Sequence, residues 1–174
     1  MAVLTFYAVF LASFWRQNFG LSREMASSLF IVIGLLSTFG SLISGKVIRR
    51  LGRKGATALS MLVVGLTTIG VTGLPDLSIS LAITFLNQVF VGLMNSSTAS
   101  LTLEQVPEYR GTVMALLSAA SNIGQMFAGV AGAILILFDY KVLGLVLGAI
   151  GIASALLIHK FSVDPTRRYD LSPK

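Results

Sequence analysis

The sequence contains no cysteine and few charged residues. Because none of its 174 residues is a cysteine, disulfide bonds, thiolate catalysis and cysteine-based metal sites are excluded. Charged residues make up 11% of the chain, hydrophobic residues make up 55%, and the mean hydropathy is +0.85. A soluble domain carries about a quarter charged residues. The composition therefore indicates a protein that lies in a lipid bilayer.

Proline is also scarce, and its four copies lie between long apolar runs or in the C-terminal tail. A hydrocarbon core of about 30 Å takes roughly 20 helical residues. The runs predict six transmembrane helices, near residues 2–18, 23–48, 55–73, 77–103, 111–138 and 142–159. The alternation of apolar and polar residues that a membrane β-barrel needs does not appear. We expect an all-α membrane protein, with a six-helix bundle over residues 1–160 and a cytoplasmic tail over residues 161–174.

Ionisable residues are absent from the central part of all six runs, so the charges between the runs report the orientation. Ten basic residues lie on one side of the expected membrane and three on the other: Lys46, Arg49, Arg50, Arg53, Lys54, Arg110, Lys160, Arg167, Arg168 and Lys174 against Arg16, Arg23 and Lys141. The positive-inside rule then places both termini in the cytoplasm. The basic clusters lack the interleaved aromatic residues of a nucleic-acid surface. The expected partner is the lipid bilayer of the cell or inner membrane, crossed several times.

A short basic stretch, GKVIRRLGRKG, lies between the second and third runs, at residues 45–55. The positive-inside rule alone accounts for basic residues in this predicted hairpin loop, and its glycines let the chain turn. The order of the residues says more. It resembles the loop signature G-x-x-x-D-R-x-G-R-K/R of the major facilitator superfamily, found between the second and third helices of each six-helix half. Five of the six specified positions are met, by Gly45, Arg50, Gly52, Arg53 and Lys54.

A second stretch, VPEYRGTVMALLSAASNIGQ, resembles the segment that joins the fourth and fifth helices of a half in the drug and sugar efflux branch. Pro107, Arg110 and Gly111 fill its Pro-x-x-Arg-Gly positions. The two resemblances imply a secondary active transporter that works by alternating access between two six-helix halves. They also imply that the loop at residues 45–54, together with Arg110 and Gly111, serves the cytoplasmic gate.

The sequence departs from the family signature at one position, because Arg49 stands where the family has an acidic residue. The family's carboxylate contributes to a charge-paired latch at the gate, and an arginine cannot accept those hydrogen bonds. A degraded signature favours the C-terminal half of a transporter. A complete member has about twelve spans, so we expect either a fragment that lacks the N-terminal half or a half-length protein that pairs with a second copy.

Polar residues follow one face of the fourth and of the fifth predicted helix. At 100° per residue they form narrow arcs, and we interpret them as lining a substrate cavity: Thr84, Gln88 and Asn95 on the fourth helix, and Ser118, Asn122 and Gln125 on the fifth. Such side chains would bind a small neutral or amphipathic solute through hydrogen bonds. The alternative is that they join membrane helices to one another.

No cofactor is expected. Because the central part of each span carries no ionisable residue, a coupling ion, expected to be a proton, would be handled by the missing half. Small residues on the second span (Gly34, Thr38, Ser41 and Gly45) and on the sixth (Gly144, Gly148 and Gly151) predict close helix packing.

Two other functions compete with transport. The chain is compatible with a six-span membrane subunit that transports nothing and only assembles with another membrane protein. An intramembrane enzyme is disfavoured, because the central part of each span contains no histidine, carboxylate or cysteine that could activate a nucleophile or hold a metal.

Overall fold

The computed structural model describes residues 9–105 and 107–162 of the chain, and the regular structure in these residues is helical. It comprises five α-helices and one 3₁₀ turn: α2 (Leu11–Phe19), α3 (Arg23–Gly73), α4 (Leu77–Gln105), η2 (Pro107–Tyr109), α5 (Arg110–Ile136) and α6 (Tyr140–Phe161). Helices α3 to α6 are each long and apolar enough to cross a membrane. The predicted all-α class is confirmed, but six separate helices are not seen.

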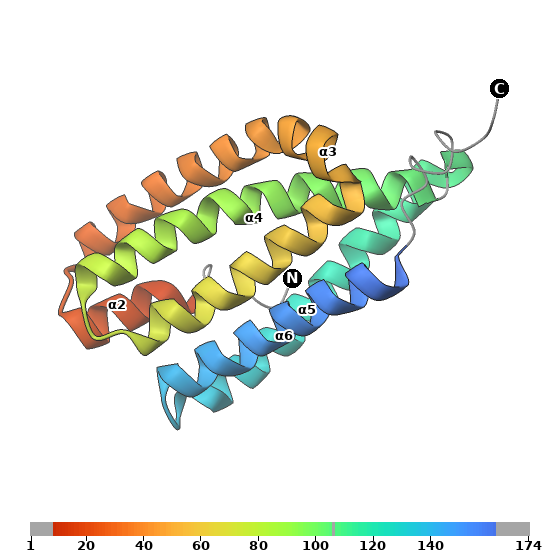
Figure 1. Cartoon of the computed structure of the whole chain (residues 1–174). Coiled ribbons are helices and arrows are strands. Elements are labelled where there is room, and N and C mark those ends of the chain that lie inside the picture. Colours follow the sequence, from red (N-terminus) through yellow and green to blue (C-terminus); the bar gives the residue numbers. More distant parts are fainter. Residues whose placement is uncertain (1–8, 106, 163–174) are drawn as a thin grey trace.

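One long helix, α3, replaces the second and third predicted helices and the loop between them. Its only non-helical backbone is at Gly52, with φ 74° and ψ 166°. Glycine reaches positive φ at little cost, and the arginine, leucine and lysine residues around it favour helix. The predicted reversal between residues 48 and 55 is therefore present, but it is a kink at one glycine rather than a loop between two separate helices. The chain folds back at a single residue, which divides α3 into a first limb (residues 23–51) and a second limb (residues 53–73), as Figure 1 shows.

The first predicted span, residues 2–18, is described only in part. Its described portion ends in α2, which stops where Gly20 takes the left-handed conformation at φ 67°. Residues 1–8 of this span and residues 163–174 of the predicted tail lie outside the described residues.

Side-chain caps fix where α3, α4 and α6 begin. The backbone N–H of Met25 donates to Ser22 Oγ at 3.2 Å at the start of α3. Asp76 accepts from the N–H groups of Ser78 and Ile79 at the start of α4, and Asp139 accepts from that of Lys141 at the start of α6. These carboxylates and hydroxyls satisfy backbone donors that the helices cannot satisfy themselves.

Glycines bring α3 against both of its main neighbours. The first limb runs along α4, where Gly40 faces the backbone of Val89 and Gly92 faces that of Ser37, so closely that a Cβ at either glycine would overlap the other helix. The second limb packs on α6, where a Cβ at Gly65 would lie 2.8 Å from the carbonyl oxygen of Gly148. Helix α3 thereby ties α4 and α6 into one bundle (Figure 1).

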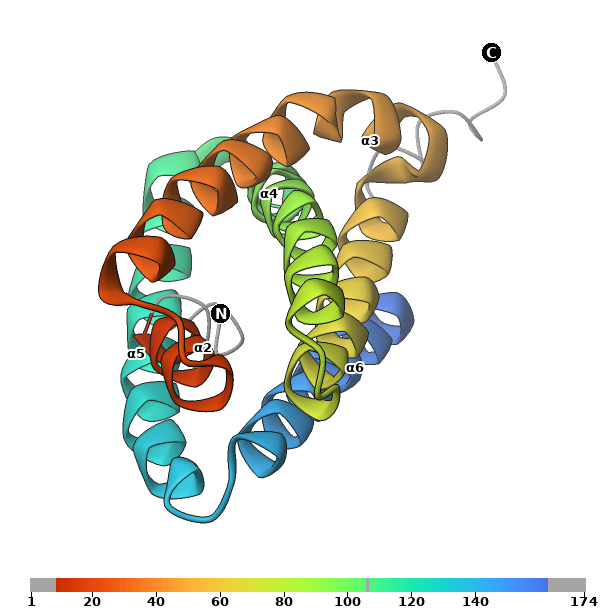
Figure 2. The same ribbon diagram turned by 90° about the vertical axis from the view of Figure 1, so that its left-hand side faces the viewer.

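The apolar core is centred on α2, at the end of the bundle where α3, α4 and α6 begin. Trp15 is fully buried, stacks at a tilt on Phe30 of α3 and donates from Nε1 to Ser80 Oγ of α4 at 3.4 Å. Phe14 packs on Tyr140 of α6 with ring centroids 5.4 Å apart. Figure 2 shows α2 enclosed by the longer helices.

The fifth helix is held more loosely than the fourth. In its most apolar stretch of 18 residues, 11% of the residues are buried, against 44% in α4. Its contact with the core lies near its C-terminal end, where a Cβ at Gly132 would be 2.6 Å from the ring of Phe10. The bundle is therefore packed firmly at the α2 end and loosely toward the start of α5.

Glycine-to-alanine substitutions test the α3–α4 contact. Alanine at an exposed helical position stabilises a helix, whereas overpacking costs about 1–3 kcal/mol. We expect Gly92→Ala to lower the midpoint of thermal unfolding in detergent, and Gly34→Ala to leave it unchanged or raise it, because nothing lies within 4 Å of a Cβ at Gly34. Fluorescence of Trp15, the one tryptophan in the chain, reports the transition. Equal effects of the two substitutions would contradict the close contact.

Candidate functional site

The turn at Gly52 brings the basic stretch of α3 beside the end of α4. Arg53 begins the second limb directly after the turn, and its Nη1 lies 3.1 Å from Oε1 of Glu104, in the last turn of α4. The Arg53 side chain is 23% exposed and that of Glu104 is 36% exposed, so the pair is partly solvated. This ion pair joins α3 to α4 at the end opposite α2.

The remaining residues of the predicted gate motif are placed around this pair, mostly on the surface. Gly45 and Arg50 are exposed on the first limb, and Arg110 and Gly111 are exposed at the start of α5. Lys54 is partly buried and makes interactions of its own. The structure thus gathers most of the motif around one turn of α3, while the two α5 residues lie on a separate helix. Their role in a gate stays a prediction.

Sequence reasoning missed Glu104 as the partner of Arg53. The chain has only seven acidic residues, which limits the candidates, but no local pattern selects Glu104 among them. What the sequence does not show is that α3 reverses at one residue, so that its second limb lies beside α4.

The polar face of α4 passes from the buried interior to the surface. Thr84 is fully buried, with its hydroxyl donating to the Ser80 carbonyl at 2.8 Å, and Gln88 is 4% exposed. Asn95 lies two turns further on, on the same face, and is exposed. The three predicted cavity residues of α4 therefore share one face, on which Thr84 and Gln88 are buried and Asn95 is exposed, whereas the hydroxyl of Thr98, about one turn further on, is buried again.

Three buried side-chain atoms of α4 lack a hydrogen-bond partner within the described residues: Oδ1 of Asn87, Nε2 of Gln88 and Oγ1 of Thr98. Nε2 of Gln88 has neither solvent nor an acceptor within the described part of the chain. A buried donor that stays unsatisfied costs about 1–3 kcal/mol. Gln88 is therefore a position where a bound polar group would gain a hydrogen bond without breaking an existing one.

The neighbouring amide, Asn87, has a structural role that the sequence interpretation did not assign. Its Nδ2 donates to Thr67 Oγ1 at 2.6 Å and to the Val64 carbonyl at 3.2 Å, both on the second limb of α3. Asn87 is fully buried and joins α4 to α3. The two adjacent amides of α4 thus differ: Asn87 holds two helices together, and Gln88 does not.

Helix α5 presents three distinct faces. Its packed face carries the buried residues Ser121, Ala128 and Gly132, and large exposed apolar side chains, including Leu116, Phe127 and Val130, lie on the opposite side. Between these two faces lie the predicted cavity residues Ser118, Asn122 and Gln125, all of which are exposed. An exposed polar strip next to the packed face is the arrangement of a helix that borders on water on one side and lipid on another.

The predicted polar residues are thus divided between two settings. Thr84 and Gln88 are buried near the middle of the bundle, whereas Asn95, Ser118, Asn122 and Gln125 are exposed on α4 and α5. Among the described residues no group of three histidine, cysteine or acidic side chains is placed to hold a metal ion.

The Arg53–Glu104 pair can be tested with a double-mutant cycle of Arg53→Gln and Glu104→Gln, monitored by thermal unfolding in detergent. A partly solvated pair couples by about 0.2–1 kcal/mol, and its coupling falls as salt screens the charges. We expect coupling of this size at low salt and its loss in 1 M salt. The exposed Arg16 serves as control, since Arg16→Gln combined with Glu104→Gln should show additive effects. Additivity of the Arg53 and Glu104 substitutions at low salt would contradict the pair.

Comparison with known proteins identifies the family of the chain. The sequence model of the Major Facilitator Superfamily matches residues 1–174. No curated protein and no solved structure matches the chain. Because the family match spans the whole sequence, the chain belongs to the major facilitator superfamily, a family of membrane transporters that are typically not enzymes.

Proposed function

We propose, from the membership of this chain in the major facilitator superfamily, that it forms one six-helix half of a secondary active transporter for a small solute. The chain would be the C-terminal half of a member of the drug and sugar efflux branch. It would pair with an N-terminal half or with a second copy, and the two bundles would rock about a site near the bilayer midplane.

The observation that carries this proposal is the polar face of α4. Membrane helices that only pack together join their polar side chains to one another, as the Nδ2 group of Asn87 does here, although Oδ1 of Asn87 has no partner within the described residues. Gln88 instead holds an unpartnered amide, and the face continues to an exposed Asn95. A polar face that leaves the core and keeps an unused donor is what a solute-binding surface requires.

The described helices are compatible with six membrane segments. The two limbs of α3 are antiparallel and would count as the second and third segments, with α4, α5 and α6 as the others (Figure 1). Helix α2 lies within the first predicted run and would belong to the first segment. This count requires the turn at Gly52 to lie at a membrane surface, where its arginines and lysines contact water.

The same turn would form part of the cytoplasmic gate. Arg53 and Glu104 close the gap between the second limb and the end of α4 on the side that the basic residues assign to the cytoplasm. An ion pair that is partly solvated breaks at little cost, and so suits a contact that forms and opens in each transport cycle. Coupling to a proton would be the task of the other half, since the described helices carry no acidic residue away from their ends.

The proposal is tested by transport in membrane vesicles that contain this chain together with its other half, using a neutral amphipathic dye and a radiolabelled disaccharide as probes. Gln88→Leu keeps the side-chain volume and removes the amide. We expect it to raise KM for the transported probe about tenfold, the effect of one lost hydrogen bond of about 1.4 kcal/mol. We expect the midpoint of thermal unfolding to be unchanged or slightly higher, because an unsatisfied buried donor has been removed.

Matched serines provide the control. Ser118 lies on the polar strip of α5, whereas Ser154 lies on α6 with its hydroxyl bonded to the Ile150 carbonyl. Ser118→Ala should weaken transport, and Ser154→Ala should not. If Gln88→Leu destabilises the protein and leaves transport unchanged, then Gln88 joins helices, and the transport site is elsewhere or absent.

A further inference from the structure

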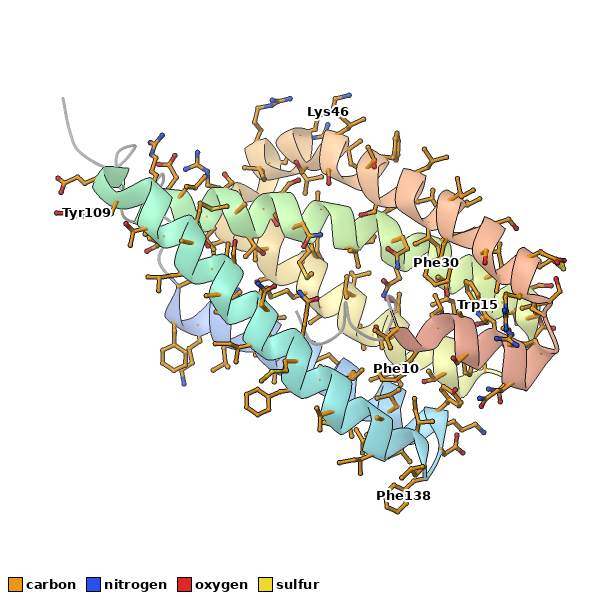
Figure 3. The ribbon with its side chains drawn as sticks, turned by 180° about the vertical axis from the view of Figure 1, so that it is seen from behind. Phe10, Trp15, Phe30, Lys46, Tyr109 and Phe138 are labelled. Atoms are coloured by element: carbon orange, nitrogen blue, oxygen red, sulfur yellow. The ribbon has the colours of Figure 1, made fainter. Side chains whose placement is uncertain are left out.

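Three basic side chains line a hollow at the end of the first limb of α3. Lys46, Arg49 and Arg50, with Val47, line one side of an open surface hollow of about 470 Å³ just before the turn at Gly52. Lys46 projects away from the helices into the surroundings (Figure 3), and all three basic residues are exposed. The hollow therefore opens outward, away from the α3–α4 contact.

These three charges have no acidic partner among the residues that the structure describes. The nearby carboxylate of Glu104 is already paired with Arg53. Three like charges within five residues repel one another. An anion bound between them would remove this repulsion. The site exists in this form because Arg49 stands at the position where the family has an acid, which would itself pair with the neighbouring cations.

An exposed apolar strip leads along the same helix face to the basic residues. Residues seven apart lie two turns apart on nearly the same face, so Leu35 and Leu42 align with Arg49, and Phe39 aligns with Lys46. Leu35, Phe39 and Leu42 are 66%, 55% and 76% exposed. The first limb thus presents apolar side chains at membrane depth and arginines at the membrane surface, which matches an acyl chain below a headgroup.

We propose that this hollow binds the phosphate group of an anionic phospholipid. Arginine presents paired N–H donors that match phosphate oxygens, and lysine adds a point charge. Basic residues next to a membrane helix attract the anionic lipids of the cytoplasmic leaflet. The assignment to that leaflet rests on the orientation given under the proposed function, whereas the phosphate site itself rests only on the hollow, its charges and the apolar strip.

The test measures lipid retained by the purified full chain, by native mass spectrometry after exchange into micelles containing phosphatidylglycerol or phosphatidylcholine. We expect one phosphatidylglycerol to remain bound in preference to phosphatidylcholine. Arg49→Asp restores the acid of the family and changes the local charge by two, so it should weaken retention about tenfold. Arg23→Asp makes the same charge change at the exposed opposite end of α3 and should leave retention unchanged.

Competition separates the sources of the phosphate. If glycerol phosphate or inorganic phosphate at millimolar concentration displaces the lipid fully, the hollow is a site for soluble phosphates, and the lipid assignment is wrong. Equal retention of both lipids, or equal effects of Arg49→Asp and Arg23→Asp, would also overturn it.

The remaining alternative is that the hollow binds the other half of the transporter instead of a lipid. If phosphatidylglycerol is not retained but Arg49→Asp weakens copurification of the other half, the hollow receives acidic residues of that half instead of a lipid. Transport by Gln88→Leu is measured independently, so failure of the lipid site leaves the proposed function standing, and failure of transport leaves the lipid result interpretable.

Discussion

Close backbone contact at glycines is the interaction on which this structure depends. Inside a bilayer, apolar side chains are equally well solvated by lipid, so helices associate through tight packing and hydrogen bonds rather than through the hydrophobic effect. Gly40 and Gly92 let the first limb of α3 meet α4, and Gly65 and Gly148 let the second limb meet α6. Each contact would be lost if a methyl group were present, and without them α3 would no longer link its neighbours.

The turn at Gly52 places both limbs of α3 against α4. It folds α3 back on itself, so that both faces of α4 can be engaged and Arg53 meets Glu104. The bundle is then fastened at two places: the aromatic core around Trp15 at one end, and a partly solvated ion pair at the other. Between them the polar face of α4 emerges from the core, beside a loosely packed α5.

Much of the fold and part of the site could be predicted from the sequence. Composition and run length identified the membrane class and the positions of α4, α5 and α6, and the order of residues 45–54 named the family. The small residues of α6 were assigned correctly, because Gly144, Gly148 and Gly151 are all buried. On α3 the prediction was right for Ser41, whose hydroxyl donates to the carbonyl of Gly92. The other predicted small residues of α3 are exposed, and Gly40 carries the close contact instead. A stripe of small residues does not specify which of two adjacent faces meets a neighbour.

Long-range pairing was not predictable from local patterns. Nothing near Arg53 in the sequence indicates Glu104, and nothing near Asn87 distinguishes its packing role from the unpartnered Gln88.

The central claim is that the polar face of α4 lines a water-filled cavity, and the lack of cysteine permits a direct measurement. Single cysteines at Thr84 and Asn95 can be treated in membranes with a charged thiol reagent, which reacts only with a thiolate in water. The account predicts rapid labelling at position 95 and little at position 84. Unreactive thiols at both positions would place this face in lipid or in a packed interface, and would contradict it.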